Sequence, residues 1–221
     1  TTAAVSGIYV RNTRAFEVSF NSLTSSSGAS GVTSGTLRGI HVTAASNQPT
    51  GTFTNTVSNN TLALTSHVLA GTINGITVES TTSSPTSTTN VNNNNFTTLN
   101  HTSAAATGAI TAISQSGSAT AGPLNHSINS NTFTNLTSSS TGSFTFISNS
   151  WTRPTSGTGN VDNNSIVTAF NKTGAGNTVT LYTSNSFSGP TINEINNNNN
   201  FSNSTVAGAT TVAGWRSTDG G

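Results

Sequence analysis

The stretch Val91-Asn92-Asn93-Asn94-Asn95-Phe96 shows the unit from which this chain of 221 residues is built. An aliphatic residue is followed by two asparagines, two and three places on, and by a large apolar residue five places on. The same pattern returns at residues 57–62, 128–133, 161–166 and 196–201, and in a weaker form at 18–23. Successive copies start 33 to 39 residues apart, so one supersecondary unit is predicted to repeat along the chain.

A short apolar segment, such as Val5-Ser6-Gly7-Ile8-Tyr9-Val10, precedes each asparagine pattern. Its order of apolar, polar, small, apolar, polar and apolar residues is typical of a β-strand with one buried face. The copies lie at residues 5–10, 37–42, 73–78, 110–115, 144–149, 179–184 and 212–217. They start 32, 36, 37, 34, 35 and 33 residues apart, which predicts seven first strands of six repeats.

The prolines mark a second fixed place in the repeat. Each lies seven to ten residues after the centre of a first strand: Pro49, Pro85, Pro123, Pro154 and Pro190. Proline lacks the N–H that a central strand donates, so these positions are predicted to be loops. The Ser-, Thr- and Gly-rich stretches 80–89 and 114–122 are likewise predicted to be surface loops.

Three short strands per repeat, stacked repeat upon repeat, predict an all-β, parallel β-helix with a ladder of turn asparagines. The predicted ladder residues are Asn21, Asn60, Asn94, Asn131, Asn164 and Asn199. A sharp turn needs a residue that tolerates positive φ, as asparagine does, and we expect Asn94 to adopt that conformation. Stacked amides can also hydrogen-bond to one another along the axis.

These strand and turn elements resemble the right-handed parallel β-helix proteins with a pectate-lyase-like repeat. In that family a Gly-Ile-x-Val-like strand is followed by an Asn-x-Phe turn, and the matching elements here span residues 5 to 215. The coil of about 35 residues is longer than the family's, because of the proline-bearing loop. The resemblance implies one right-handed β-helix over residues 1–221. The family contains lyases, phage tailspikes, adhesins and other surface proteins, so the fold alone does not decide the function.

The composition excludes several classes of partner. Charged residues make up 5% of the chain, the formal net charge is +1, and no basic stripe is present, so nucleic acid is not an expected partner. No apolar run approaches the roughly 18 residues of a membrane span. Low charge with abundant Thr and Asn is typical of secreted proteins, and we expect an extracellular or cell-surface location.

Five carboxylates are the candidates for acid chemistry: Glu17, Glu79, Asp162, Glu194 and Asp219. Only Asp162 and Glu194 fall in neighbouring coils near the same place, and they are offset by three positions. Glycoside hydrolysis needs two carboxylates within roughly 5 to 10 Å, and a hard cation needs several oxygen ligands. We therefore expect no catalytic residue, no cofactor and no enzyme activity.

His67 and His101 each lie five residues after a third-strand anchor, Leu62 or Phe96. They are expected to stack in adjacent coils about 4.8 Å apart, as an outward polar pair. Two ligands fall short of the three or four of a usual metal site, so they are weak metal candidates. Trp151 and Arg153 are the best candidates for a contact with sugar.

The sequence favours a structural protein: a subunit of a surface fibre that assembles head to tail with itself, or an adhesin stalk. The alternative is a carbohydrate-binding or polysaccharide-degrading β-helix, similar to a tailspike, with surface carbohydrate as its partner. The missing carboxylate cluster separates the two hypotheses.

Overall fold

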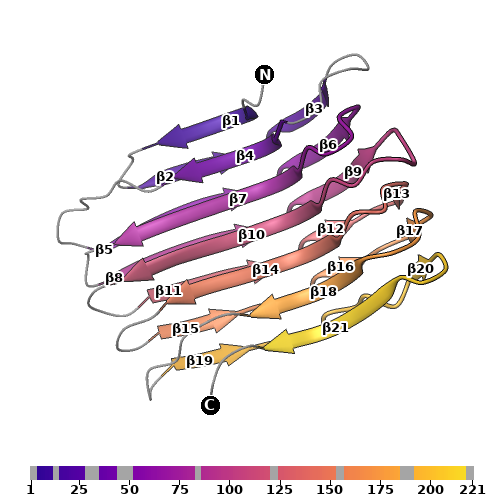
Figure 1. The fold of residues 1–221 in the computed structure, drawn as a ribbon. Coiled ribbons are helices and arrows are strands. Elements are labelled where there is room, and N and C mark those ends of the chain that lie inside the picture. Colours follow the sequence, from indigo (N-terminus) through magenta and orange to yellow (C-terminus); the bar gives the residue numbers. More distant parts are fainter. Residues whose placement is uncertain are drawn as a thin grey trace.

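The computed structural model describes residues 4–11, 15–27, 35–43, 52–82, 86–119, 124–152, 157–184 and 192–217, and in these ranges the regular elements are all strands. Seven parallel strands form the first sheet, which faces the viewer in Figure 1. They are β1 (Val5–Arg11), β4 (Leu37–Thr43), β7 (Ile73–Thr82), β10 (Ile110–Ala119), β14 (Phe144–Thr152), β18 (Thr178–Ser184) and β21 (Thr211–Ser217).

The other strands form three further parallel sheets around the same core. The second sheet contains β2 (Phe16–Ser19), β5 (Thr52–Ser58), β8 (Thr86–Asn92), β11 (Leu124–Asn129), β15 (Gly157–Asn160) and β19 (Ile192–Ile195). The third contains β3 (Ser22–Ser27), β6 (Thr61–Ser66), β9 (Asn95–His101), β12 (Thr132–Phe133) and β16 (Ser165–Ile166). The fourth contains β13 (Leu136–Ser138), β17 (Phe170–Lys172) and β20 (Ser204–Val206).

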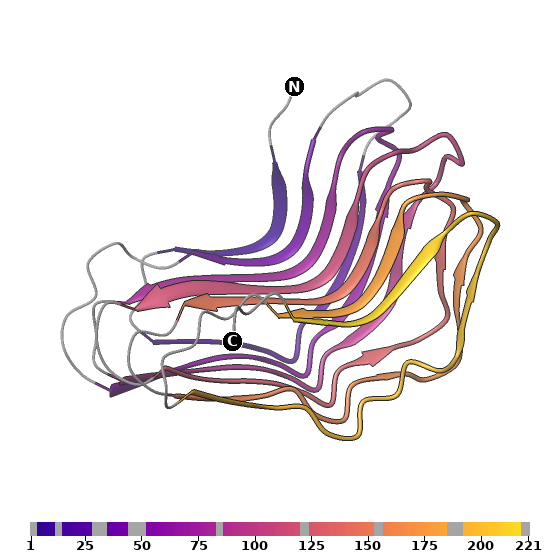
Figure 2. The same cartoon turned by 60° about the horizontal axis from the view of Figure 1, so that its bottom comes forward.

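The chain winds through these sheets in turn, and each circuit is one coil of a right-handed solenoid (Figure 2). Residues at one place of the repeat pair directly between coils, as Val5 pairs with Leu37, and Val179 with Val212. The spacings between paired first strands are those found in the sequence. The parallel β-solenoid predicted from the repeat is therefore confirmed.

The core consists of columns of apolar side chains that run along the solenoid axis. Ile40, Ile76 and Ile113 are paired in successive coils and are fully buried. Phe96 stacks on Phe133, with ring centroids 5.2 Å apart, in the next column. These columns link every coil to the next, so the apolar core is continuous along the described stack.

The predicted loops are shorter in the structure than in the sequence analysis. β7 continues to Thr82, β8 starts at Thr86 and β10 continues to Ala119, so most of the predicted loop residues 80–89 and 114–119 form strands. Pairing with the neighbouring coils outweighs the low strand propensity of Ser and Gly. All five prolines lie outside the described residues.

Candidate functional site

The asparagine ladder is present in the structure and is directional. Each ladder asparagine from Asn21 to Asn164 donates from both its backbone N and its Nδ2 to the Oδ1 of the next one. Asn60 thus donates to Asn94 Oδ1 at 3.1 and 2.9 Å, and Asn94 donates to Asn131 Oδ1 at 3.0 Å from both atoms. The second Nδ2 hydrogen returns to the preceding coil, as from Asn94 to the carbonyl oxygen of Val57. The same bonds connect all six predicted residues, from Asn21 to Asn199.

The ladder residues do not hold the positive φ that was expected of them. The left-handed residue is the one before each: Asn93 has a φ of 57°, whereas Asn94 is not among the positive-φ residues. The two positions differ for a physical reason. The exposed residue forms the turn, and the side-chain amide of the buried residue points along the solenoid axis. The expectation of backbone strain at Asn94 is therefore wrong.

The predicted stack of His67 and His101 is also wrong. Thr97 is an extra residue in β9, so the pairing shifts by one and His101 lies beside Ser66. His67 instead contacts Thr102, with 2.8 Å between His67 Nδ1 and Thr102 Oγ1. His101 is fully buried, and its Nδ1 donates to the carbonyl oxygen of Val68 at 3.1 Å. A β-bulge of this kind re-aims the side chains that follow it.

Burial lowers the pKa of His101 below its usual value, and its Nε2 has no hydrogen-bond partner among the described residues. The folded state thus disfavours the protonated ring. The contribution of neutral His101 to the free energy of unfolding is fully present above the pKa of histidine in the unfolded chain, about 6.5, and is lost as the pH falls below it. We expect the urea midpoint to fall as the pH is lowered from 8 through 6.5 toward 5. His101→Gln should flatten this fall. Equal pH profiles for wild type and His101→Gln would contradict this role for His101.

Lys172 is a buried residue that the sequence analysis missed. Its side chain is fully buried, and its Nζ donates to the carbonyl oxygens of Ser140 and Gly174, both at 2.6 Å. Burial lowers the pKa of Lys172, and no carboxylate lies within ion-pair distance of it among the described residues. The alternation in Phe170-Asn171-Lys172, which places the first and third side chains on the same inward face of the strand, was the signal in the sequence that could have identified Lys172 as buried. Lys172 serves here to satisfy the carbonyls of a tight corner.

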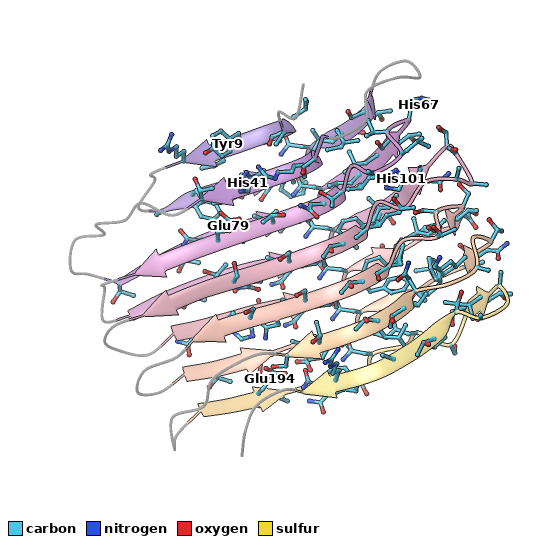
Figure 3. The ribbon with its side chains drawn as sticks, viewed as in Figure 1. Tyr9, His41, His67, Glu79, His101 and Glu194 are labelled. Atoms are coloured by element: carbon cyan, nitrogen blue, oxygen red, sulfur yellow. The ribbon has the colours of Figure 1, made fainter. Side chains whose placement is uncertain are left out.

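The carboxylate pair remains apart, as its sequence offset predicted. Glu194 pairs in register with Gly159, while Asp162 accepts a hydrogen bond from the backbone N of Asn197 at 2.8 Å. Glu194 lies at the inner side of the second sheet (Figure 3), where it accepts hydrogen bonds from Tyr182 Oη and from Ser184 Oγ. Burial and the charge of Glu194 raise the pKa of Tyr182, so Tyr182 stays a neutral donor.

The other candidates stand alone or lie beyond the described part. The Trp151 side chain, Arg153 and Asp219 fall outside the described residues, and Glu17 is an exposed residue of β2. Within the described ranges, no three His, Asp or Glu side chains gather as metal ligands. The described residues contain no helix long and apolar enough to cross a membrane.

A polar cluster that the sequence analysis did not find lies on the outer face of the first sheet. Tyr9, His41 and Glu79 lie in neighbouring strands (Figure 3). The Tyr9 and His41 rings stack with centroids 5.2 Å apart, and His41 Nε2 is 3.4 Å from Glu79 Oε2. Arg38 Nη1 lies 3.3 Å from His41 Nδ1, beside a shallow cavity of about 290 Å³ that Ala4, Ser6 and Tyr9 also line. The pairing of strands 32 and 36 residues apart brings these residues together.

The two ends of the ladder differ chemically. Asn21 donates to Asn60, and within the described residues its own Oδ1 accepts no hydrogen bond. Asn199 accepts from Asn164 and donates one Nδ2 hydrogen to Val161, which leaves its backbone N and second Nδ2 hydrogen unused by described residues.

Apolar side chains that are buried in the inner coils are exposed in the outermost ones. Val5 at the amino-terminal end is 59% exposed and Trp215 at the carboxyl-terminal end is 46% exposed, whereas the residues with which they pair, Leu37 and Tyr182, are buried. The two outermost coils thus present apolar surface and ladder hydrogen-bonding groups together.

Comparison of this chain with models of protein families, with curated proteins and with solved structures yields no match.

Proposed function

We propose that this protein is a structural subunit of an extracellular fibre, or of an adhesin stalk, and that copies associate head to tail. The observation that carries the proposal is the polarity of the asparagine ladder. The donors at Asn199 that no described residue accepts match the acceptor at Asn21 that no described residue uses, while two like ends would oppose donor to donor or acceptor to acceptor. A contact between unlike ends is heterologous and generates an open filament.

The edges of the sheets support the same arrangement. β2 and β19 are the edge strands of the second sheet, and among described elements each has a strand neighbour on one side only. An open strand edge is a template for pairing with another chain. With a net charge of +1, long-range repulsion between copies is small.

We expect the purified chain to form fibres at high concentration, visible by electron microscopy and sedimenting faster as concentration rises. Asn199→Leu removes the ladder donor side chain at one end, so it should raise the concentration needed for fibres by about tenfold, the effect of one buried hydrogen bond. Asn171→Leu, on the exposed side of β17, is the matched control and should assemble as the wild type does. A homogeneous monomer at every concentration would refute the fibre proposal.

A second candidate function is carbohydrate binding, favoured by the outer cluster of Tyr9, Arg38 and His41. An exposed aromatic ring beside an arginine suits a sugar ring that bears polar groups. Incubation with a panel of acidic and neutral polysaccharides tests it, with retention on the polymer reporting binding and falling viscosity or unsaturated product reporting cleavage. Tyr9→Ala should abolish retention, and Thr180→Ala on the same face should not.

A further inference from the structure

The first sheet contains one more strand than the second sheet. Among described residues it has seven strands, while the second sheet has six and the ladder has six asparagines. If β21 of one copy stacked on β1 of the next, a gap of one strand spacing, about 4.8 Å, would remain in the second sheet and in the ladder. If instead Asn199 bonded to the next Asn21, β21 and the next β1 would compete for one place.

We propose that β21 of one copy takes the place of β1 of the next copy and displaces it. This proposal rests on the proposed fibre. β21 would then lie between β18 of its own copy and β4 of its neighbour. β19 would pair with the neighbour's β2, and Asn199 would donate to the neighbour's Asn21. All the sheets and the ladder would continue across the junction without a gap.

The glycine pattern supports the exchange. In the β1 place, a Cβ on Gly7 would lie 2.8 Å from Leu23 Cδ2 and 3.0 Å from the carbonyl oxygen of Gly39, so the β1 place beside β4 favours glycine. β21 carries Gly214 at the aligned position, where an added Cβ would meet nothing within 4 Å. Its own copy therefore does not need this glycine. The nearer strands β10, β14 and β18 carry larger residues there, namely Ala112, Phe146 and Leu181.

The two strands are interchangeable in sequence and weakly held. Val5-Ser6-Gly7-Ile8 matches Val212-Ala213-Gly214-Trp215 in its order of apolar and small residues. No residue of β1 is fully buried, and among the described strands β1 pairs only with β4. After exchange, the half-exposed Val212 and Trp215 would be covered by the neighbour's Leu37 and Ile40. The exchange replaces one strand pair by another and adds the contacts of the second sheet and the ladder.

Cysteine pairs test the exchange directly, because the natural chain has no cysteine. Ser6 pairs with Arg38 within one copy, so Ala213 should face Arg38 of the neighbour after exchange. Paired Cα atoms of adjacent strands are within disulfide reach. Oxidised fibres of Ala213→Cys/Arg38→Cys should give a ladder of covalent oligomers. Oxidised Ser6→Cys/Arg38→Cys, with β1 locked in place, should form no fibres and should regain assembly on reduction.

The outcomes separate the exchange from the fibre itself. Gly214→Ala should raise the fibre-forming concentration about tenfold or more, because the added methyl group would crowd the β1 place beside β4 of the neighbouring copy. The unfolding midpoint of the monomer should not change. Fibres that form equally well from the locked variant would overturn the exchange but leave the fibre standing. Covalent oligomers from Ser6→Cys/Ala213→Cys would also overturn it in favour of direct stacking. Absence of wild-type fibres would overturn both proposals.

Discussion

Gly108→Ala is expected to lower the free energy of unfolding by about 3 kcal/mol or more, at or above the upper end for overpacked sites. An added Cβ would lie 1.8 Å from the carbonyl oxygen of Gly71 in the preceding coil and 2.9 Å from His101 Cε1. The nearest obstacle is backbone, so it cannot rotate away as a side chain could. Gly71 and Gly142 are confined in the same way by the carbonyl oxygens of Gly35 and Gly108. Relief would require the coils themselves to separate.

Urea unfolding followed by circular dichroism measures this loss. Gly214→Ala is the matched control, since a Cβ there meets no atom within 4 Å and the monomer should change by less than about 0.5 kcal/mol. If Gly108→Ala unfolded at the same urea concentration as the control, the close approach of the coils at this corner would be wrong.

Asn94→Leu is expected to lower the free energy of unfolding by about 3 kcal/mol or more. Each buried polar group that loses its hydrogen-bond partner contributes a penalty of about 1–3 kcal/mol. Asn94 is fully buried. The substitution removes the acceptor of Asn60 N and Nδ2 and the donor to Val57 and Asn131. A leucine of similar size fills the space but restores none of these bonds.

Substitutions at Asn93 separate the ladder from the turn. Asn93→Leu should cost only about 1–2 kcal/mol, the penalty of the left-handed conformation for a residue with a Cβ. Asn93→Gly should be close to neutral, since glycine adopts positive φ readily. Unfolding midpoints of the three variants give the comparison. Equal losses for Asn94→Leu and Asn93→Leu would show that the buried amide adds nothing beyond the turn.

The coil architecture was predictable because the same sequence pattern repeats once in each coil. The apolar positions of the first strands and the ladder asparagines recur at spacings that set the pairing register, and Val91, Asn94 and Phe96 each stack on their counterparts in neighbouring coils. Six ladder residues were thus identified from spacing alone. The local sequence pattern and the global fold agree here, which is why the parallel β-solenoid could be predicted from the sequence.

Features that depend on single irregular residues were not predictable. One extra residue, Thr97, turned His101 inward, and its trace in the sequence is small: Phe96 and Leu99 are three residues apart where Leu62 and Leu64 are two apart. The left-handed residue was placed one position too late, since the sequence shows two adjacent asparagines without saying which one bears the strain. Lys172 and the Tyr9–His41 cluster depend on tertiary contacts between coils, which sequence order alone does not display.

The axial rise per subunit of the fibre, measured by electron microscopy with helical reconstruction, tests the central claim most directly. The solenoid is proposed to continue through each junction with β21 in the place of the next β1, so each copy adds six coils. At about 4.8 Å per coil the rise should be about 29 Å. A rise of about 34 Å, equal to seven strand spacings, would contradict the continuous ladder, and a sample without fibres would contradict the account as a whole.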